Sequence, residues 1–288
     1  MVTGLYAESH GILNNLMFDP ILNASFGYQT LRRADPDELS SWFRQNKRAE
    51  PVWITNVKAG GFRRSAVYWI AGDCPFDNLT NAQNYMFIPY NETRSFESLI
   101  DSFIQMFIDK ERPINFGALY FNQPDWTGHS VGTSESSLRS TFEMLDNAIG
   151  HLIDALKANN LFDQVNLIVT SDHGMVGANT STVTFLSEHI DMSLFDAYGS
   201  PALYMLYFRA TTTANNQTKE QNIQLVYAKL KKLPNIDTFR ANEIPEEFHF
   251  RQNRRVGDIL IVAKLTHIIA LDKSQFSFSG HSKYYFLT

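Results

Sequence analysis

Three things are scarce in this 288-residue chain, and each scarcity excludes a class of protein. Cys74 is the only cysteine, so no disulfide can form within the chain and no thiolate cluster can hold a metal. No stretch approaches the roughly 18 consecutive apolar residues of a membrane span. Basic residues are outnumbered, with 25 Lys and Arg against 30 Asp and Glu. The resulting net charge of −5 argues against a protein that binds a nucleic-acid backbone.

The compartment is indicated by possible glycosylation sites. Five asparagines fit the N-x-[ST] acceptor pattern, where chance would give about one or two: Asn23, Asn78, Asn91, Asn179 and Asn216. They favour an extracellular glycoprotein. No signal peptide follows Met1, so a secreted parent protein implies that N-terminal sequence is missing.

Hydrophobic residues make up 44% of the chain, enough for the core of one sizeable α/β domain over residues 1–288. Short apolar runs bounded by turn residues predict buried strands of a largely parallel sheet: Ala66–Ile70, Phe116–Phe121, Val165–Thr170, Leu203–Phe208 and Asp258–Ala263. Apolar residues at three- and four-residue spacing predict helices over Ser98–Lys110 and Ser137–Asn159. This alternation predicts a sheet with helices on both faces.

Two of the predicted strands end in a similar way. "FNQPDWTGHS" places Asp125 and His129 after one strand, and "NLIVTSDHGM" places Asp172 and His173 after another. Ligands collect beyond the carboxyl ends of parallel strands, and zinc accepts carboxylate and imidazole ligands. The pairs therefore predict a zinc site at this edge. The alternative is an Asp that caps a local turn and a His at the surface.

The same motifs carry a family resemblance. "VTGLYAESHGILNNLMFDP", "QPDWTGHSVGTSE" and "NLIVTSDHGM" resemble the ectonucleotide pyrophosphatase/phosphodiesterase family, which belongs to the alkaline phosphatase superfamily. "YWIAGDCPF" and "YNETRSFESL" extend the match over most of the chain. The resemblance implies an alkaline-phosphatase-like three-layer sandwich, two zinc ions and a nucleophilic Thr that forms a covalent nucleotidyl intermediate.

By this resemblance, Asp125 and His129 would ligate one zinc together with a later histidine, for which His281 is the candidate. Asp172 and His173 would ligate the second zinc, with an Asp and the nucleophilic Thr from upstream. On the substrate side, the side-chain amide of Asn15 would donate to a phosphate oxygen. Four further residues would form the wall of a nucleotide pocket: Tyr90, Tyr120, Trp69 and Asp73.

The chain also departs from the family pattern. The nucleophilic Thr belongs to a Thr-Phe-Pro-Asn-His segment just before the equivalent of "VTGLY", and residues 1–288 do not contain it. Thr3 lies downstream of that position and is expected to be structural. The sandwich is expected to be incomplete at both ends, with impaired binding of the second zinc. The residues that flank His281 differ from the family pattern as well.

Three interpretations therefore stay open. The first is a zinc phosphodiesterase or nucleotide pyrophosphatase, secreted or tethered to a membrane, whose nucleophile is outside this chain. The second is a catalytically inactive truncated isoform or fragment. The third is a choline-phospholipid phosphodiesterase with the same metals. In each case the expected partner is a small phosphodiester.

Overall fold

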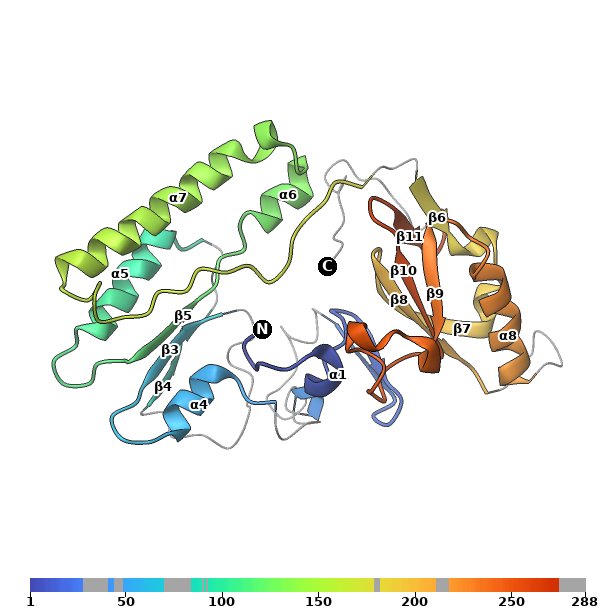
Figure 1. Ribbon diagram of the computed structural model, residues 1–288, viewed down its shortest axis with the longest axis horizontal. Coiled ribbons are helices and arrows are strands. Elements are labelled where there is room, and N and C mark those ends of the chain that lie inside the picture. Colours follow the sequence, from blue (N-terminus) through green and yellow to red (C-terminus); the bar gives the residue numbers. More distant parts are fainter. Residues whose placement is uncertain are drawn as a thin grey trace. The chain divides into compact units, whose positions relative to one another are not determined.

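The structure is a computed structural model, and it describes residues 1–27, 41–43, 49–69, 84–89, 91, 93–178, 182–210 and 218–274 (Figure 1). The described residues fall into two compact units. Unit 1 contains those within 1–5, 34–126 and 138–172, and unit 2 contains those within 6–33, 127–137 and 173–288. The prediction of a single domain stays a prediction, and each unit is described by itself.

Unit 1 is built on a parallel sheet with the strand order β4-β3-β5. Its elements are α4 (Val52–Lys58), β3 (Ser65–Tyr68), β4 (Tyr85–Phe87), α5 (Phe96–Phe107), β5 (Phe116–Leu119) and the long helix α7 (Glu135–Ala158). The strands predicted near Ala66 and Phe116 are confirmed, as are both predicted helices with shifted ends.

Alternation along β3 assigns each face of this sheet to a helix, because successive side chains of a strand point to opposite faces. Val67 packs with Trp53 of α4, whereas Ala66 and Tyr68 pack with Phe103 of α5. Figure 1 shows α4 on one side of the sheet, with α5 and α7 on the other. The result is a three-layer arrangement with β3 fully buried at its centre.

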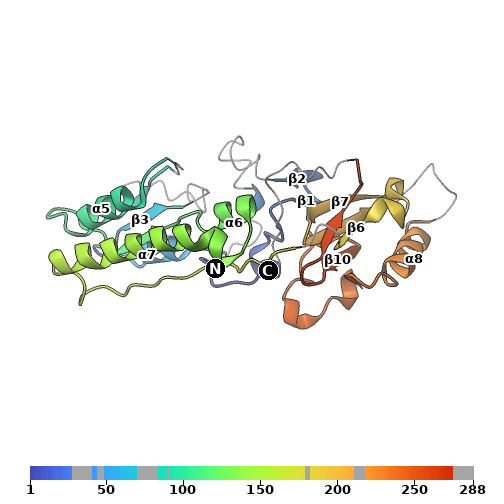
Figure 2. The same cartoon turned by 90° about the horizontal axis from the view of Figure 1, so that it is seen from above.

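Helix α5 begins at a capping serine. The side chain of Ser95 accepts a hydrogen bond from the amide of Ser98, which satisfies one of the open donors in the first turn. Ile100 and Ile104 of α5 then meet Ala148 and Leu156 of α7 in a shared apolar cluster. Figure 2 shows the two helices running along the same layer. This packing fixes α7 beside α5 on one face of unit 1.

Unit 2 is built on an antiparallel sheet with the strand order β7-β8-β10-β9. Its strands are β1 (Met17–Asp19), β2 (Ala24–Phe26), β6 (Val183–Phe185), β7 (Phe195–Ser200), β8 (Leu203–Phe208), β9 (Ile236–Arg240), β10 (Ile259–Ala263) and β11 (Ile268–Ala270). The helices are α1 (Ala7–His10), α6 (Asp125–Val131), which begins in unit 1, and α8 (Lys219–Leu230). The short 3-10 helices are η2 (Leu186–Glu188), η3 (Met192–Leu194), η4 (Ala241–Glu243) and η5 (Glu246–Phe248). Ile223, Val226 and Leu230 of α8 pack in the main apolar cluster of this unit.

Two details of the predicted sheet are wrong. Leu203–Phe208 and most of Asp258–Ala263 are strands, but they pair antiparallel to each other. Only two residues separate β7 from β8, and so short a connection can join only antiparallel strands. Val165–Thr170 is not a strand: Val165 lies in a bend, and the residues from Asn166 onward are exposed and have no regular secondary structure. Apolar composition favours a strand, yet a strand forms only beside a partner backbone.

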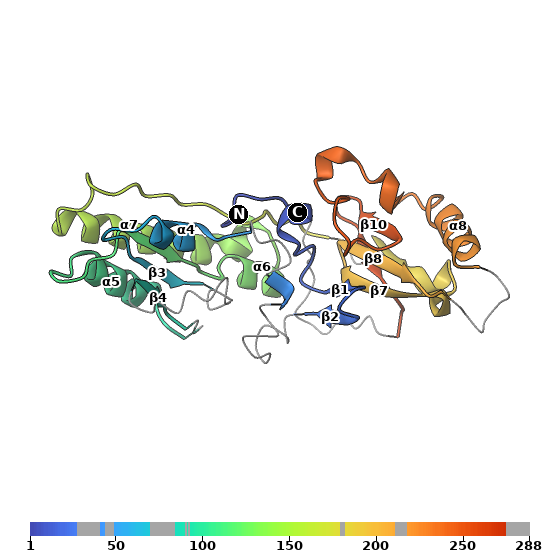
Figure 3. The same ribbon diagram turned by 90° about the horizontal axis from the view of Figure 1, so that it is seen from below.

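A buried ion cluster fastens the N-terminal part of unit 2 to the loop before β10. Asp19, which is fully buried, accepts hydrogen bonds from Arg254 Nη2 and Arg255 Nε, each at 2.7 Å. Arg255 is 1% exposed and also donates from Nη1 to the carbonyl of Gly11 at 2.6 Å. Nearby, Phe18 of β1 stacks on Tyr198 of β7 with ring centroids 5.3 Å apart, and Figure 3 shows the two strands side by side.

Candidate active site

Two aromatic side chains meet at the carboxyl edge of the parallel sheet in unit 1. Trp69 directly follows β3 and Tyr120 directly follows β5, and their ring centroids are 5.2 Å apart. The amide of Tyr120 donates to the carbonyl of Tyr68 at 2.9 Å, which continues the strand pairing up to this point. Both rings are half-buried. The structure therefore brings together two of the predicted pocket residues at the edge where ligands of such sheets collect.

The first Asp/His pair lies on a helix, not on the expected loop. Asp125 is in the first turn of α6 and His129 is in its last turn, and both are half-buried. Residues four apart lie on the same face of a helix, so one ion can reach both side chains. The placement also suits the helix itself, because a carboxylate is favourable near the N-terminus and a protonated imidazole near the C-terminus.

The second pair lies in a segment without regular secondary structure. Asp172 is exposed and His173 is half-buried, and the His173 ring nitrogen Nδ1 is 2.9 Å from the carbonyl oxygen of Gly174. A carbonyl only accepts hydrogen bonds, so Nδ1 carries the proton in this arrangement and Nε2 is the basic nitrogen of the neutral ring. Histidines that bind metals commonly hold their other nitrogen in this way. The local geometry is thus suitable for metal binding through Nε2.

A glycine in α6 allows the two motifs to touch. Gly128 is buried, and a Cβ added to it would overlap the side chain of Met175. Gly128 directly precedes His129, and Met175 is two residues after His173. Sequence reasoning missed this contact, although both residues belong to the quoted motifs. The contact ties the helix that carries the first pair to the loop that carries the second.

The metal site itself stays a prediction. Among the residues that the structure describes, no group of three or more His, Cys, Asp and Glu side chains is placed to hold an ion. The boundary between the two units runs between Asp125 and His129 and again between Asp172 and His173. Two carboxylates and two imidazoles remain a donor set that suits zinc chemically.

Comparison with known proteins decides the family. Residues 1–281 match the family described as type I phosphodiesterase / nucleotide pyrophosphatase. The chain belongs to this family. It is 33% identical over 284 residues to human ectonucleotide pyrophosphatase/phosphodiesterase family member 5, a match that covers 98% of this chain and 55% of the relative. It is 30% identical to the mouse bis(5'-adenosyl)-triphosphatase, covering 98% and 57% of the two chains.

Solved structures of this phosphodiesterase family confirm the fold class. Murine family member 5 superposes with a TM-score of 0.80 at 36% identity, covering 98% of this chain and 70% of the other. The human protein gives a TM-score of 0.79 at 30% identity. The predicted alkaline-phosphatase-like α/β fold is therefore confirmed. The chain spans about half the length of the curated relatives that it matches.

Of the remaining predicted residues, Asn15 is exposed in the turn before β1, within unit 2. Asp73, Tyr90 and His281 lie outside the described residues, as do three predicted glycosylation sites, Asn78, Asn179 and Asn216. Asn23 and Asn91 are exposed, as an acceptor of a glycan must be. Glycosylation and the roles of the phosphodiesterase site residues stay predictions.

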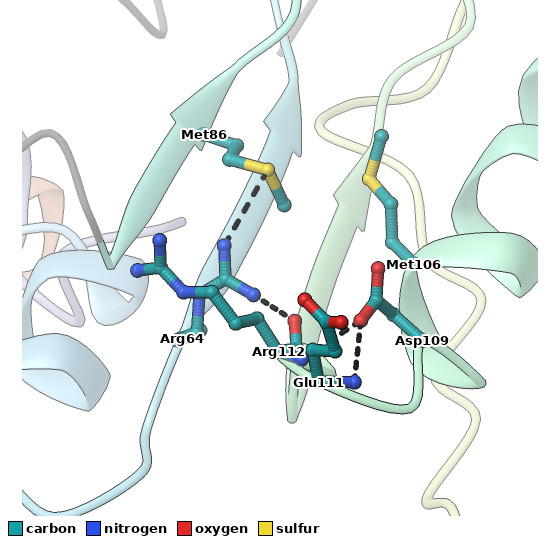
Figure 4. A pocket seen from close by; sticks show the side chains of 6 residues that line it. All are labelled: Arg64, Met86, Met106, Asp109, Glu111 and Arg112. Carbon is teal, nitrogen blue, oxygen red and sulfur yellow. Dashed lines mark hydrogen bonds between the residues drawn. The ribbon is translucent and has the colours of Figure 1, made fainter.

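A surface pocket of about 190 Å³ lies elsewhere in unit 1, lined by Arg64, Met86, Met106, Asp109, Glu111 and Arg112. Arg64 directly precedes β3, so the pocket is at the amino end of the parallel strands, opposite the edge that carries Trp69 and Tyr120. Figure 4 shows Arg64 donating to the carbonyl of Arg112 and Asp109 accepting from nearby amides. None of the predicted site residues lines this pocket.

Proposed function

We propose that this chain contributes the metal-binding part of a zinc-dependent phosphodiesterase that hydrolyses phosphodiester or pyrophosphate bonds of nucleotides. The observation that carries the proposal is the contact of Gly128 with Met175, which joins the helix bearing Asp125 and His129 to the segment bearing Asp172 and His173. Membership of the family gives the reaction class. The names of the relatives, one of them a bis(5'-adenosyl)-triphosphatase, favour nucleotides as substrates.

Each group has a distinct role in this proposal. Asp125, His129 and His281 hold one zinc, while Asp172 and His173 contribute to the second. The bound ions would lower the pKa of an attacking hydroxyl and offset the charge that builds on the phosphoryl oxygens. Asn15 donates a hydrogen bond to a phosphate oxygen, which stabilises the anionic transition state.

The aromatic residues would bind the nucleoside. Trp69 and Tyr120 already form a half-buried pair at the carboxyl edge of the sheet, and Tyr90 and Asp73 would complete the wall. Stacking of a base on an aromatic ring contributes about 1–3 kcal/mol. Aromatic rings also bind the quaternary ammonium of choline, so this pair fits both substrate classes, and it is the names of the relatives that favour nucleotides.

A specific observation favours a second candidate for residues 1–288 on their own, namely a catalytically inactive form. The expected Thr-Phe-Pro-Asn-His segment is not among these residues. A solved complex of murine family member 5 with AMP uses a threonine-to-alanine variant described as inactive. We therefore expect residues 1–288 to bind zinc weakly and to lack turnover by themselves.

The proposal includes an extracellular location for the protein. Five N-x-[ST] sites and the ectonucleotide names of the relatives support an extracellular location. Within the described part of the chain, no helix is long and apolar enough to span a membrane.

The test is zinc binding, which does not require a nucleophile. Isothermal titration of the 288-residue chain should give a zinc affinity that falls at least about tenfold in Asp125→Ala and in His129→Ala. His189→Ala is the matched control, because His189 is exposed and belongs to neither pair. Unchanged affinity in both site variants would remove the ligand assignment.

Activity separates the remaining alternatives. The 288-residue chain should release no nitrophenol from a nitrophenyl ester of thymidine monophosphate, and turnover at the rate of a full-length relative would contradict the inactive form. In a longer protein that includes the threonine segment, Asp172→Ala should abolish hydrolysis. Faster hydrolysis of nitrophenylphosphorylcholine than of the nucleotide ester would instead favour a choline-phospholipid phosphodiesterase.

A further inference from the structure

The pocket at the amino end of the parallel strands in unit 1 has no part in the proposed function. Its volume of about 190 Å³ is smaller than the roughly 300–1,000 Å³ of pockets for drug-sized ligands. Its lining combines two guanidinium groups, two carboxylates and two thioethers: Arg64, Arg112, Asp109, Glu111, Met86 and Met106. A ligand of this size and mixed charge is a small polar group that carries charges of both signs.

The guanidinium of Arg64 is held at the wall of this pocket. Its Nη1 donates to the carbonyl oxygen of Arg112, and its Nη2 lies 3.9 Å from the sulfur of Met86 (Figure 4). Burial and the neighbouring positive charge of Arg112 lower the pKa of Arg64, whereas the carboxylate of Asp109 raises it. The two guanidinium groups are therefore close enough to repel each other, and a bound phosphate group would offset that repulsion.

The pocket carries negative charge as well. Asp109 Oδ1 accepts hydrogen bonds from the amides of Arg112 at 2.7 Å and Glu111 at 2.9 Å, and these bonds lower the pKa of Asp109. Among the described residues both bonds end on Oδ1, so Oδ2 can accept from an ammonium group of a ligand. With Glu111, the lining has two positive and two negative charges, and their formal sum is zero. Such a lining is complementary to a zwitterion and not to a simple anion.

A fully exposed aromatic ring belongs to the turn that enters β3. Phe62 is 100% exposed and lies two residues before Arg64. Gly60 and Gly61 form the turn with φ angles of 76° and 68°, which other residues rarely adopt. Figure 1 shows this turn at the same end of unit 1 as the turn between α5 and β5, which carries the two carboxylates of the pocket. Aromatic rings favour the boundary between lipid headgroups and acyl chains.

We propose that the amino end of unit 1 docks on a membrane of zwitterionic phospholipids, with a headgroup in the pocket and the ring of Phe62 in the membrane interface. The two arginines hold the headgroup phosphate, and Asp109 and Glu111 face its ammonium group. Met86 and Met106 pack against the carbon atoms of the headgroup, since thioethers adapt to irregular apolar shapes. The zero charge sum of the lining favours this surface over an anionic membrane.

Docking at this end keeps the bilayer away from the predicted nucleotide pocket. Trp69 and Tyr120 follow β3 and β5 at the carboxyl ends of the strands, whereas Arg64 precedes β3 at the amino end. The edge of unit 1 that carries the two aromatic rings therefore faces away from the membrane. This consequence depends on the proposed function, whereas the docking does not.

Sedimentation with phosphatidylcholine vesicles tests the docking on the 288-residue chain. The fraction of bound protein, measured as the lipid concentration is raised, gives a partition coefficient. Phe62→Ala should lower this coefficient by about tenfold, because the variant has no ring to insert into the apolar interface. Leu265→Ala is the matched control: Leu265 is 67% exposed but belongs to unit 2, and its loss should leave the coefficient unchanged.

Reversal of one charge tests the headgroup pocket. Glu111→Lys changes the charge sum of the lining from zero to +2, so the chain should come to prefer anionic lipid. The ratio of its partition coefficients for phosphatidylglycerol and phosphatidylcholine vesicles should rise by about fivefold or more. Glu143→Lys makes the same change in total charge on an exposed position of α7, and it should shift the ratio much less.

A wild-type chain that does not bind phosphatidylcholine vesicles would overturn the proposal, as would equal effects of Phe62→Ala and Leu265→Ala. Tighter binding of the wild-type chain to phosphatidylglycerol than to phosphatidylcholine would show that the surface recognises an anion and not a zwitterion. Self-association in sedimentation velocity that Phe62→Ala abolishes would show that a second copy covers this face, and would overturn the choice of a membrane. None of these measurements depends on zinc or on turnover.

Discussion

Asp19→Asn tests the buried ion cluster of unit 2 most directly. The substitution keeps the shape of the side chain but removes the carboxylate charge that lies opposite the buried guanidinium of Arg255. Removing one partner of a buried ion pair typically costs about 3–5 kcal/mol. We therefore expect the free energy of unfolding at neutral pH to fall by about that amount.

The pH dependence of the stability gives a second, independent value for the contribution of the Asp19 carboxylate. Burial alone would raise the pKa of the Asp19 carboxyl, but hydrogen bonds from Arg254, Arg255 and the amides of Leu22 and Ile21 outweigh it and lower the pKa to about 2. A fall from 3.8 to about 2 corresponds to about 2.4 kcal/mol of stability. Because the folded-state pKa is lowered, this stability is present above about pH 4 and is lost as the pH falls toward 2.

Urea unfolding followed by circular dichroism, repeated at several pH values, measures both effects. The wild-type chain should lose this contribution between about pH 4 and pH 2, and the loss should be smaller in Asp19→Asn. Asp196→Asn is the matched control: Asp196 pairs with Arg209 at the surface, where an ion pair contributes about 0–1 kcal/mol. Equal effects of the two substitutions, or identical acid profiles of wild type and Asp19→Asn, would refute the reasoning.

Three further predictions concern packing, a helix cap and the nucleotide pocket. Gly117→Val should destabilise unit 1 by about 1–3 kcal/mol, because even a Cβ there lies 3.0 Å from the ring of Phe103; an unchanged melting temperature would contradict this. Thr218→Ala should lower stability by about 1 kcal/mol, since Thr218 and Gln221 form the capping box of α8, and hydrogen exchange in the first turn of α8 should quicken. In an active longer protein, Tyr120→Ala should weaken hydrolysis of nucleotide esters by about tenfold more than hydrolysis of a small nitrophenyl phosphodiester, and equal losses would indicate a packing role.

Local sequence patterns were sufficient where the structure depends on local physics. The spacing of apolar residues predicted α5 and α7 because each helix buries one face, and short apolar runs predicted β3, β5, β8 and β10. Strand direction was harder to predict. β8 and β10 pair antiparallel, and the amino-acid composition of the two strands does not determine this direction.

The candidate site shows the same limit. The pairing of Asp125 with His129 was predicted from the motif, but its place on α6 was not, since "DWTGHSV" has a glycine in the middle of the helix. That glycine is explained only by Met175, which is distant in sequence. The prediction of a strand over Val165–Thr170 was wrong for a related reason. A strand forms only beside another strand, and the residues of the segment do not determine whether such a neighbour is present.

The Asp19–Arg255 ion pair also bears on synthesis of the protein. Its partners are 236 positions apart, so Asp19 leaves the ribosome long before Arg255 is made. At roughly 5–20 residues per second, the delay is about 10 to 50 seconds. Throughout that interval β1 lacks the guanidinium that neutralises its carboxylate, so the N-terminal strand of unit 2 is expected to dock only after translation of the loop before β10.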